Sequence, residues 1–299
     1  MSETPKRRGK PVKPKWAVAR DRARRAGSGA GPETVWLFGL HAVRDALANP
    51  RRRRHRLIVT PNAAAKLAGA IASAGIEPEI ADPRRFTAPL DPQSVHQGAA
   101  LEAEPLDWGG LEALCAPTRA HPAPVIVLLD RVTDPHNAGA ILRSAEVFGA
   151  RAVVAPRHHS APETGALAKS ASGALERQPY LKVRNLGDAM QQLAGMGYAL
   201  IGLDATAEAA LGPAIAAAAG QPLGLVLGAE GAGLRQRTRQ LCGALARISA
   251  VSEFGSLNVS NAAAVALFAA SERAANAKNP LVSKIIAHNI ATKGYRIET

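Results

Sequence analysis

Beyond residue 124, short apolar runs alternate regularly with longer amphipathic stretches. Runs rich in Val, Leu and Ile predict strands at 125–129, 152–154, 180–183, 198–203, 223–227 and 247–251. Apolar positions three or four residues apart predict helices between and after them, at 138–148, 164–177, 186–194, 207–219, 234–241 and 259–275. Such alternation predicts an α/β fold with a mostly parallel sheet covered by helices on both faces.

A smaller α/β unit is predicted before this region. Its pattern indicates helices at 41–48 and 63–74 and strands at 56–59 and 77–80. The Pro- and Gly-bearing stretch between the two units has the composition of a linker with a short helical piece. The expected domains are a basic tail at 1–32, a small domain at 33–106, a linker at 107–123, a larger domain at 124–276 and a C-terminal extension without an assigned role at 277–299.

Charge points to a polyanionic partner. The net charge is +13, and residues 1–32 hold ten Lys or Arg against two acidic residues, which is +8 of that total. A segment so basic and so poor in apolar residues is expected to be disordered when free and to grasp RNA, the alternative being a solvated tail. A second cluster is expected to bind RNA, against the alternative of a solvated loop; it consists of Arg51, Arg52, Arg53, Arg54 and Arg56.

Other features exclude several classes of protein. No apolar run approaches the roughly eighteen residues of a membrane span, and no apolar segment of a secretory signal follows the basic start, so we expect a cytoplasmic protein without a membrane partner. Cys115 and Cys242 lack CxxC spacing and are predicted to be free buried thiols. The adjacent His158 and His159 would face opposite sides of a strand, so no metal site is expected.

Three short polar segments lie where predicted strands end, which is where open α/β sheets bind ligands. They are Asp134–Gly139 with Arg143, Leu227–Leu234, and Ser256–Ser260. The glycines of the second segment are spaced GxxGxG, the reverse of the dinucleotide fingerprint, and no Gly-Lys-Ser/Thr follows any glycine loop. Both a Rossmann dehydrogenase and a P-loop nucleotide-binding protein are therefore disfavoured.

Each polar residue also has a purely structural interpretation. Asn137 could cap a helix, Arg143 could form a surface ion pair, and the glycines could serve only a tight turn. What favours function is the combination, because one sheet edge could gather Asn137, Arg143, Glu230, Ser256 and Asn258.

In these motifs the chain resembles the SpoU (TrmH) family of RNA 2'-O-ribose methyltransferases, within the SPOUT class. The three segments occur in the family's order, and Ser172–Glu176 matches a further family stretch. Residues 35–104 are similar to the substrate-binding domain of the subfamily that modifies guanosine in large-subunit ribosomal RNA. The alternatives are a tRNA methyltransferase of the same family and a non-catalytic RNA-binding protein on this scaffold.

The resemblance implies a C-terminal trefoil knot, a homodimer and S-adenosyl-L-methionine as cofactor. By position, the cofactor contacts fall on Leu227, Gly228, Ile248 and Leu257. The usual Ile-Pro-Met-x-Gly run of the third motif is replaced here by residues 248–252, Ile-Ser-Ala-Val-Ser, and the loss of Pro and Gly alters the shape that this loop can take.

The resemblance also implies catalytic roles for the five polar residues, with Arg143 as the family's proposed general base on the 2'-hydroxyl. Deprotonating a guanidinium, whose reference pKa is about 12.5–13.8, costs roughly 7–9 kcal/mol at pH 7. We therefore expect a charged Arg143 that stabilises the developing alkoxide or holds the adjacent phosphate. Asn137 and Glu230 are expected to orient the substrate or Arg143, and Ser256 and Asn258 to bind near the cofactor or hold the knot loop.

Overall fold

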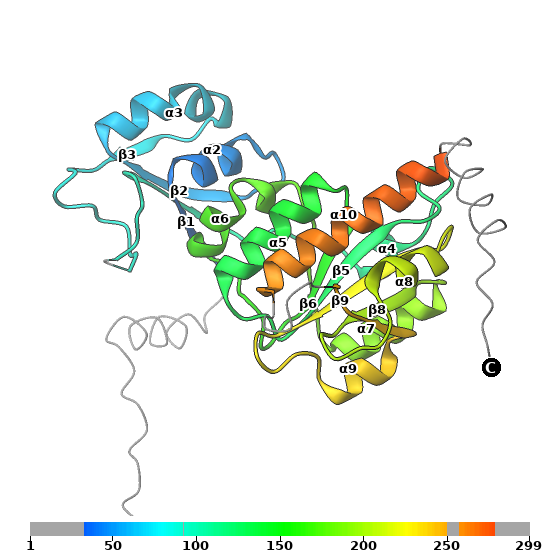
Figure 1. The fold of residues 1–299 in the computed structure, drawn as a ribbon. Helices are drawn as coiled ribbons and strands as arrows, with labels where there is room; N and C mark the ends of the chain where they lie inside the picture. The colour runs from blue at the N-terminus through cyan, green and yellow to red at the C-terminus, as the bar shows by residue number, and fades with distance from the viewer. Residues whose placement is uncertain (1–32, 92, 250–256, 279–299) are drawn as a thin grey trace, which may run out of the picture.

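The structure, a computed structural model, describes residues 33–91, 93–249 and 257–278 and contains two sheets (Figure 1). The smaller sheet has the strand order β1-β4-β2-β3 and carries two helices. Its elements are β1 (Val35–Phe38), α2 (Leu40–Ala48), β2 (Arg54–Val59), α3 (Pro61–Ala74), β3 (Pro78–Ile80) and β4 (Ala99–Ala103). Strand β4 pairs antiparallel with both β1 and β2, whereas β3 pairs parallel with β2.

The larger sheet has six strands in the order β10-β8-β9-β5-β6-β7, and every pair in it is parallel. The strands are β5 (Val125–Asp130), β6 (Ala152–Pro156), β7 (Tyr180–Val183), β8 (Ala199–Leu203), β9 (Leu223–Gly228) and β10 (Ala244–Ala246). The helices are α4 (Leu111–Cys115), α5 (Pro135–Val147), α6 (Gly165–Ala171), the 3-10 turn η1 (Ala174–Glu176), α7 (Leu186–Gly195), α8 (Leu211–Ala217), α9 (Gln236–Leu241) and α10 (Val259–Lys278).

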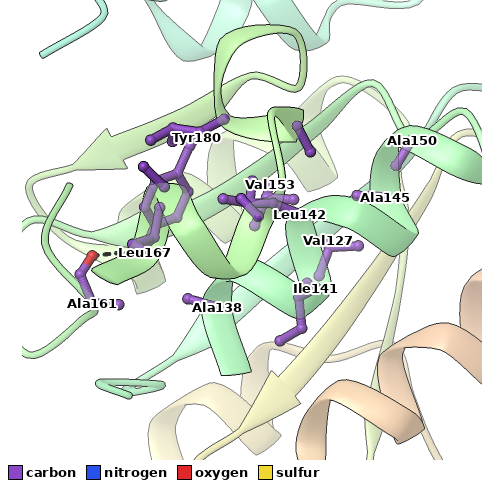
Figure 2. Packing of buried hydrophobic residues seen from close by; sticks show 14 of the residues in the cluster. Val127, Ala138, Ile141, Leu142, Ala145, Ala150, Val153, Ala161, Leu167 and Tyr180 are labelled. Carbon is purple, nitrogen blue, oxygen red and sulfur yellow. Dashed lines mark hydrogen bonds between the residues drawn. The ribbon is translucent and has the colours of Figure 1, made fainter. Parts of the chain in front are cut away.

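Helices cover both faces of this sheet, as the alternating pattern predicts. Helices α5, α6, α8 and α10 lie on one face, and α4, α7 and α9 lie on the other. Neighbouring residues of β5 point to opposite faces, so Val127 is buried in the core beside α5 and Ile126 in the core beside α7. Figure 2 shows Ile141 and Leu142 of α5 packed against the sheet near Val127. Burying each such side chain contributes roughly 1.5–3 kcal/mol.

The parallel strands all end at the same edge of the sheet, which we call the carboxyl edge. The chain leaves β5 at Asp130, β6 at Pro156, β7 at Val183 and β9 at Gly228. The loops that follow these strands therefore gather at one side of the molecule, where open parallel sheets bind ligands.

Several elements differ from the sequence-based expectation, among them β1 (Val35–Phe38), for which no strand was predicted. The helix predicted at 164–177 ends at Ala171, because Ser172 and Gly173 adopt left-handed backbone conformations before the 3-10 turn. The last strand lies at Ala244–Ala246 rather than 247–251. Strand β4 was not predicted, because its sequence Ala-Ala-Leu-Glu-Ala has low β propensity and is stabilised by its two neighbours. The trefoil knot stays a prediction, since residues 250–256 lie outside the described part of the chain.

A buried ionic cluster joins the two units. Arg52 has no exposed side-chain surface, and its guanidinium binds Glu176 through both oxygens, at 2.7 and 3.1 Å, and Glu163 at 2.5 Å. Asn49 donates to the main-chain and side-chain oxygens of Glu176, and Arg177 pairs with Asp45 of α2. The expectation that Arg52 binds RNA is therefore wrong: its guanidinium is buried and holds the two units together.

Replacing Arg52 tests this joint. The variant Arg52→Ala leaves two buried carboxylates without their cation, so the free energy of unfolding should fall by about 3–5 kcal/mol in urea denaturation. Arg53→Ala is the control, because that side chain is 81% exposed and its loss should cost less than about 0.5 kcal/mol. Equal denaturation midpoints for the two variants would contradict the assignment.

Candidate active site

Asn137 lies in the first turn of α5, and its side chain is not the helix cap. Asp134 has that role, since its Oδ1 accepts a hydrogen bond from the amide of His136 at 3.0 Å, and Pro135 occupies the first helical position. The capping interpretation of Asn137 is therefore wrong. Its amide is buried yet remains available for other contacts.

The three motifs meet at this amide. Asn137 Nδ2 donates to Glu230 Oε1 at 3.1 Å, and Asn258 Nδ2 donates to Asn137 Oδ1 at 3.0 Å. Asn258 also donates to Glu230 Oε1, so one carboxylate oxygen accepts from both amides. The Oδ1 atom of Asn258 accepts from the amide and the hydroxyl of Ser260 at the start of α10. A loop and the first turns of two helices are thus fixed to one another through three polar side chains.

Glycines determine the path of the loop that carries Glu230. Gly231 and Gly233 have φ angles of 74° and 63°, and the backbones of Ala229 and Gly233 pair with each other. A Cβ on Gly228 would lie 2.1 Å from the carbonyl carbon of Gly233. The turn therefore needs its glycines, and it directs Glu230 back toward α5.

Helices α5 and α6 approach each other closely at Gly139, the glycine of the first motif. A Cβ on Gly139 would lie 2.6 Å from the Ser170 side chain and 2.8 Å from the backbone nitrogen of Ala171. The hydroxyl of Ser170 also donates to the carbonyl of His136 at 2.9 Å. Helices α5 and α6 therefore pack with their backbones close together, which sets the position of the turn that bears Asn137.

Arg143 does not join this network. Its side chain is exposed and forms no hydrogen bond or ion pair with the described residues, so neither a surface ion pair nor an anchor on Glu230 is present. It lines an open hollow of about 270 Å³ together with Val147 and Phe148. Ser256, the fifth candidate, lies outside the described residues.

The expected cofactor positions lie at the ends of neighbouring strands. Leu227 is buried at the end of β9, so only its main chain is accessible, and Gly228 follows it. Ile248 comes shortly after β10 and is half-buried, and Leu257 is 50% exposed. Residues 250–256 between them lie outside the described part.

The four remaining arginines of the second basic cluster differ in their contacts. Arg51 donates to the carbonyl of Asp107 and lies 4.5 Å from the centre of the Trp108 ring. Arg54 donates to a main-chain oxygen, and Arg56 forms two 3.0 Å bonds to Glu79. Arg53 lies 3.7 Å from a carboxylate oxygen of Glu104, and its side chain is 81% exposed.

The segment after β6 differs from the expectation. His158 and His159 do not lie on a strand but in a loop, where His159 has a φ of 59°, and both line one hollow at the carboxyl edge. Among the residues that the structure describes, no group of three or more His, Cys, Asp and Glu could hold a metal ion, and no helix is long and apolar enough to cross a membrane.

Lys182 anchors the loop that carries His158 and His159. Its Nζ donates to Ser160 Oγ, to the Ala161 carbonyl and to Tyr180 Oη, at 2.6–2.8 Å. Burial lowers the pKa of Lys182 to about 7. The loop that carries the two histidines is therefore anchored by a buried amine.

Comparison with known proteins identifies the family. Residues 124–268 match the model of the SpoU rRNA Methylase family, and residues 36–108 match the model for RNA 2'-O ribose methyltransferase substrate binding. The chain belongs to the SpoU methyltransferase family. This confirms the resemblance stated from the sequence motifs.

Members of the SpoU family with curated names cover most of the chain. The 23S rRNA (guanosine-2'-O-)-methyltransferase RlmB of Burkholderia sp is 42% identical over 181 residues, which are 57% of this chain and 72% of that relative. The RlmB protein of Ralstonia nicotianae is 36% identical over 239 residues, which are 78% of this chain and 94% of that relative.

Solved structures of SpoU methyltransferases share the fold. The AviRb protein of Streptomyces viridochromogenes, in complex with AdoMet, superposes with a TM-score of 0.68 at 24% identity, covering 86% of this chain and 96% of AviRb. An AdoMet-bound rRNA methyltransferase from Sinorhizobium meliloti gives 0.69 at 21% identity, with coverage of 86% and 92%. These likenesses confirm the predicted α/β architecture.

The buried amine of Lys182 makes stability depend on pH. The unfolded chain keeps the lysine proton up to its ordinary pKa of about 10.4, whereas the folded protein releases it above about 7, so stability should rise with pH between these values. Relative to Lys182→Met, the wild type should gain about 2–3 kcal/mol of unfolding free energy between pH 7 and 9.5 in urea denaturation. Parallel pH profiles for the two proteins would show that the amine is not desolvated.

Proposed function

We propose that this SpoU methyltransferase transfers a methyl group from S-adenosyl-L-methionine to the ribose 2'-hydroxyl of a guanosine in large-subunit (23S) ribosomal RNA. The observation that carries the proposal is the contact between Asn137, Glu230 and Asn258, which come from three motifs far apart in the chain. The RlmB relative that is 36% identical over 94% of its own length supports the choice of substrate. A ribosomal RNA substrate implies a cytoplasmic location.

The cofactor would be held by Leu227, Gly228, Ile248 and Leu257. Strands β9 and β10 flank β8, so the residues that follow them lie at the same edge. Main-chain groups and apolar side chains suit an adenosine and a methionine chain, and they place no cation against the sulfonium. When bound, the cofactor supplies an electrophilic methyl group.

The chain's own side chains would orient the ribose and stabilise charge. Asn137 is held on both sides by hydrogen bonds, so its position is fixed before RNA binds, and positioning of this kind supplies much of a barrier reduction. Glu230 fixes both amides. Arg143 stays charged and acts on the developing alkoxide or on the neighbouring phosphate. Ser256, outside the described residues, would bind near the cofactor or hold the knot loop.

A second copy of the chain would complete the site. The exposed apolar side chains Val147, Val265 and Phe268 lie on α5 and α10, two helices that pack together. Arg143 is one helical turn before Val147 and so shares its face. Arg143 and Asn137 are six residues apart, about 120° around the helix, so Arg143 faces the second copy rather than Glu230 of its own chain.

Deletion of the gene tests the proposed activity. One 2'-O-methylguanosine should disappear from 23S rRNA when ribose methylations of rRNA and tRNA are mapped by mass spectrometry. Expression of the wild type should restore it. Loss of a tRNA methylation instead would assign the enzyme to tRNA, and no loss at all would favour a non-catalytic RNA-binding protein.

Arg143→Ala tests the site in an assay with purified protein. With purified protein and unmethylated 23S rRNA transcript, the variant should transfer methyl groups about 10²–10³ times more slowly, as expected when one charge-stabilising donor is removed. Its affinity for S-adenosyl-L-methionine should be unchanged. Arg119→Ala, an exposed arginine before β5 at the opposite edge of the sheet, is the matched control. Methylation at the wild-type rate by Arg143→Ala would exclude a role of Arg143 in methyl transfer.

Phe268→Glu tests the second copy. The buried carboxylate would cost several kcal/mol at an apolar interface, so light scattering should give the monomer mass for the variant and the dimer mass for the wild type. Val95→Glu provides the control, because Val95 is 61% exposed on the smaller sheet's domain. A wild-type monomer at micromolar concentration would contradict the proposal.

A further inference from the structure

A second hollow lies at the carboxyl edge, apart from the network of Asn137, Glu230 and Asn258. Its volume is about 270 Å³, and its walls come from the loops after β5, β6 and β7 and from the residue before α9. Its polar lining residues are Arg131, His158, His159, Arg184, Asn185 and Arg235. None of the residues that line it is acidic.

The positive charges of Arg131 and Arg184 in this hollow are not compensated by any described residue. Arg131, Arg184 and the two histidines form no hydrogen bond or ion pair with the described residues. Arg235 binds the buried Asp130 through both its amide and its guanidinium, at 3.0 and 2.7 Å, so that carboxylate is already engaged.

The acidic residue of α7 near this hollow is also paired. Asp188, in the first turn of α7, lies 3.5 Å from Arg237 and is paired there. Gathering guanidinium groups in one concavity raises the local positive potential, which an anion relieves.

The backbone holds this arrangement under strain. Arg131 and His159 have φ angles of 64° and 59°, which cost non-glycine residues energy and occur often at ligand sites. Lys182 anchors the histidine loop through Ser160 and Ala161. The ten-residue helix α7 begins at the hollow with its cap, Asn185, and so adds the positive end of its dipole.

The location connects this hollow with the methylation site. Arg131 is three residues before Asp134, the cap of α5, so the two lie at most about 11 Å apart along the chain. On the other side, the loop of His158 reaches Glu163, which holds Arg52 beside the exposed Arg53. The hollow is therefore connected along the chain both to the turn that bears Asn137 and to the buried pair of Glu163 with Arg52.

We propose that this hollow binds a phosphate of the RNA backbone and so fixes the register in which the target ribose reaches Asn137. Planar guanidinium groups bind phosphate oxygens through two parallel hydrogen bonds, and contacts of this kind position a nucleic acid without reading its bases. The inference rests on the proposed function, because it takes RNA as the polyanion.

Replacing the two unpaired arginines tests it. The double variant Arg131→Gln/Arg184→Gln should bind unmethylated 23S rRNA transcript about tenfold more weakly at 150 mM salt. The slope of log affinity against log salt should decrease in magnitude by about 0.7–0.9, the value for one lost phosphate contact. KM for RNA should rise, while kcat at saturating RNA and the affinity for S-adenosyl-L-methionine stay unchanged.

The single variant Arg184→Gln should also bind the transcript more weakly than the wild type, and Arg119→Gln is its matched control. Arg119 is exposed before β5, at the opposite edge of the sheet, and its replacement removes the same charge. It should leave RNA affinity and the salt slope at their wild-type values. Both replaced arginines, Arg131 and Arg184, are exposed, so thermal unfolding should confirm that all variants are folded.

The outcomes separate this inference from the proposed function. Wild-type affinity and salt slope in the double variant would overturn the phosphate site while leaving methylation intact. A lower kcat with unchanged KM, or weaker cofactor binding, would place the hollow in the catalytic centre and also overturn the inference. If the wild type binds the transcript but does not methylate it, and the double variant binds more weakly, the proposed function fails and the phosphate site stands.

Discussion

The parallel direction of all six strands in the larger sheet is the constraint on which the site depends. Parallel strands end at one edge, so the residues after β5 and β9 approach each other although they are about a hundred positions apart in the chain. The contact of Asn137 with Glu230 follows from the direct pairing of β5 with β9, which brings Asp130 opposite Gly228. Helix α10 packs against α5 and adds Asn258 to the same place. An antiparallel pair would have sent these side chains to opposite edges.

The second constraint is the ionic joint between the two units. Arg52, Glu163 and Glu176 are buried together, and the hydrophobic core continues from the smaller sheet through α6 into the larger one. Gly165 marks how closely the units approach, since a Cβ there would lie 2.2 Å from the Phe38 ring. Under the function proposed above, a smaller domain fixed in this way would present RNA to the carboxyl edge in one orientation. The position of the substrate would then be set by rigid elements rather than by a flexible tether.

Periodicity was sufficient to predict the α/β architecture and most helices, because the larger sheet has long buried strands between amphipathic helices. It failed at two elements. Strand β4 is rich in alanine and forms because neighbouring strands pair with it. The helix after Thr164 ends earlier than predicted, at two residues with positive φ. The motifs identified three residues that the structure brings together. They could not show that Asp134, and not Asn137, caps α5, since both types cap helices well. Nor could they show that strand β6 ends at Pro156, so that the two histidines lie in a loop rather than on opposite sides of a strand.

The arginines of this basic chain differ in whether folding pairs them with a carboxylate, which the sequence composition does not show. The sequence holds 37 Lys and Arg residues, and a run such as 51–56 looks uniform. In the structure Arg52 and Arg235 are bound to buried carboxylates, and their charge stabilises the fold. Arg131, Arg143 and Arg184 form no such pair with the described residues and border the carboxyl edge or the face of α5. A guanidinium that folding leaves unpaired near the network of Asn137, Glu230 and Asn258 keeps its full attraction for phosphate. The path of an RNA strand is therefore better inferred from unpaired arginines than from clusters in the sequence.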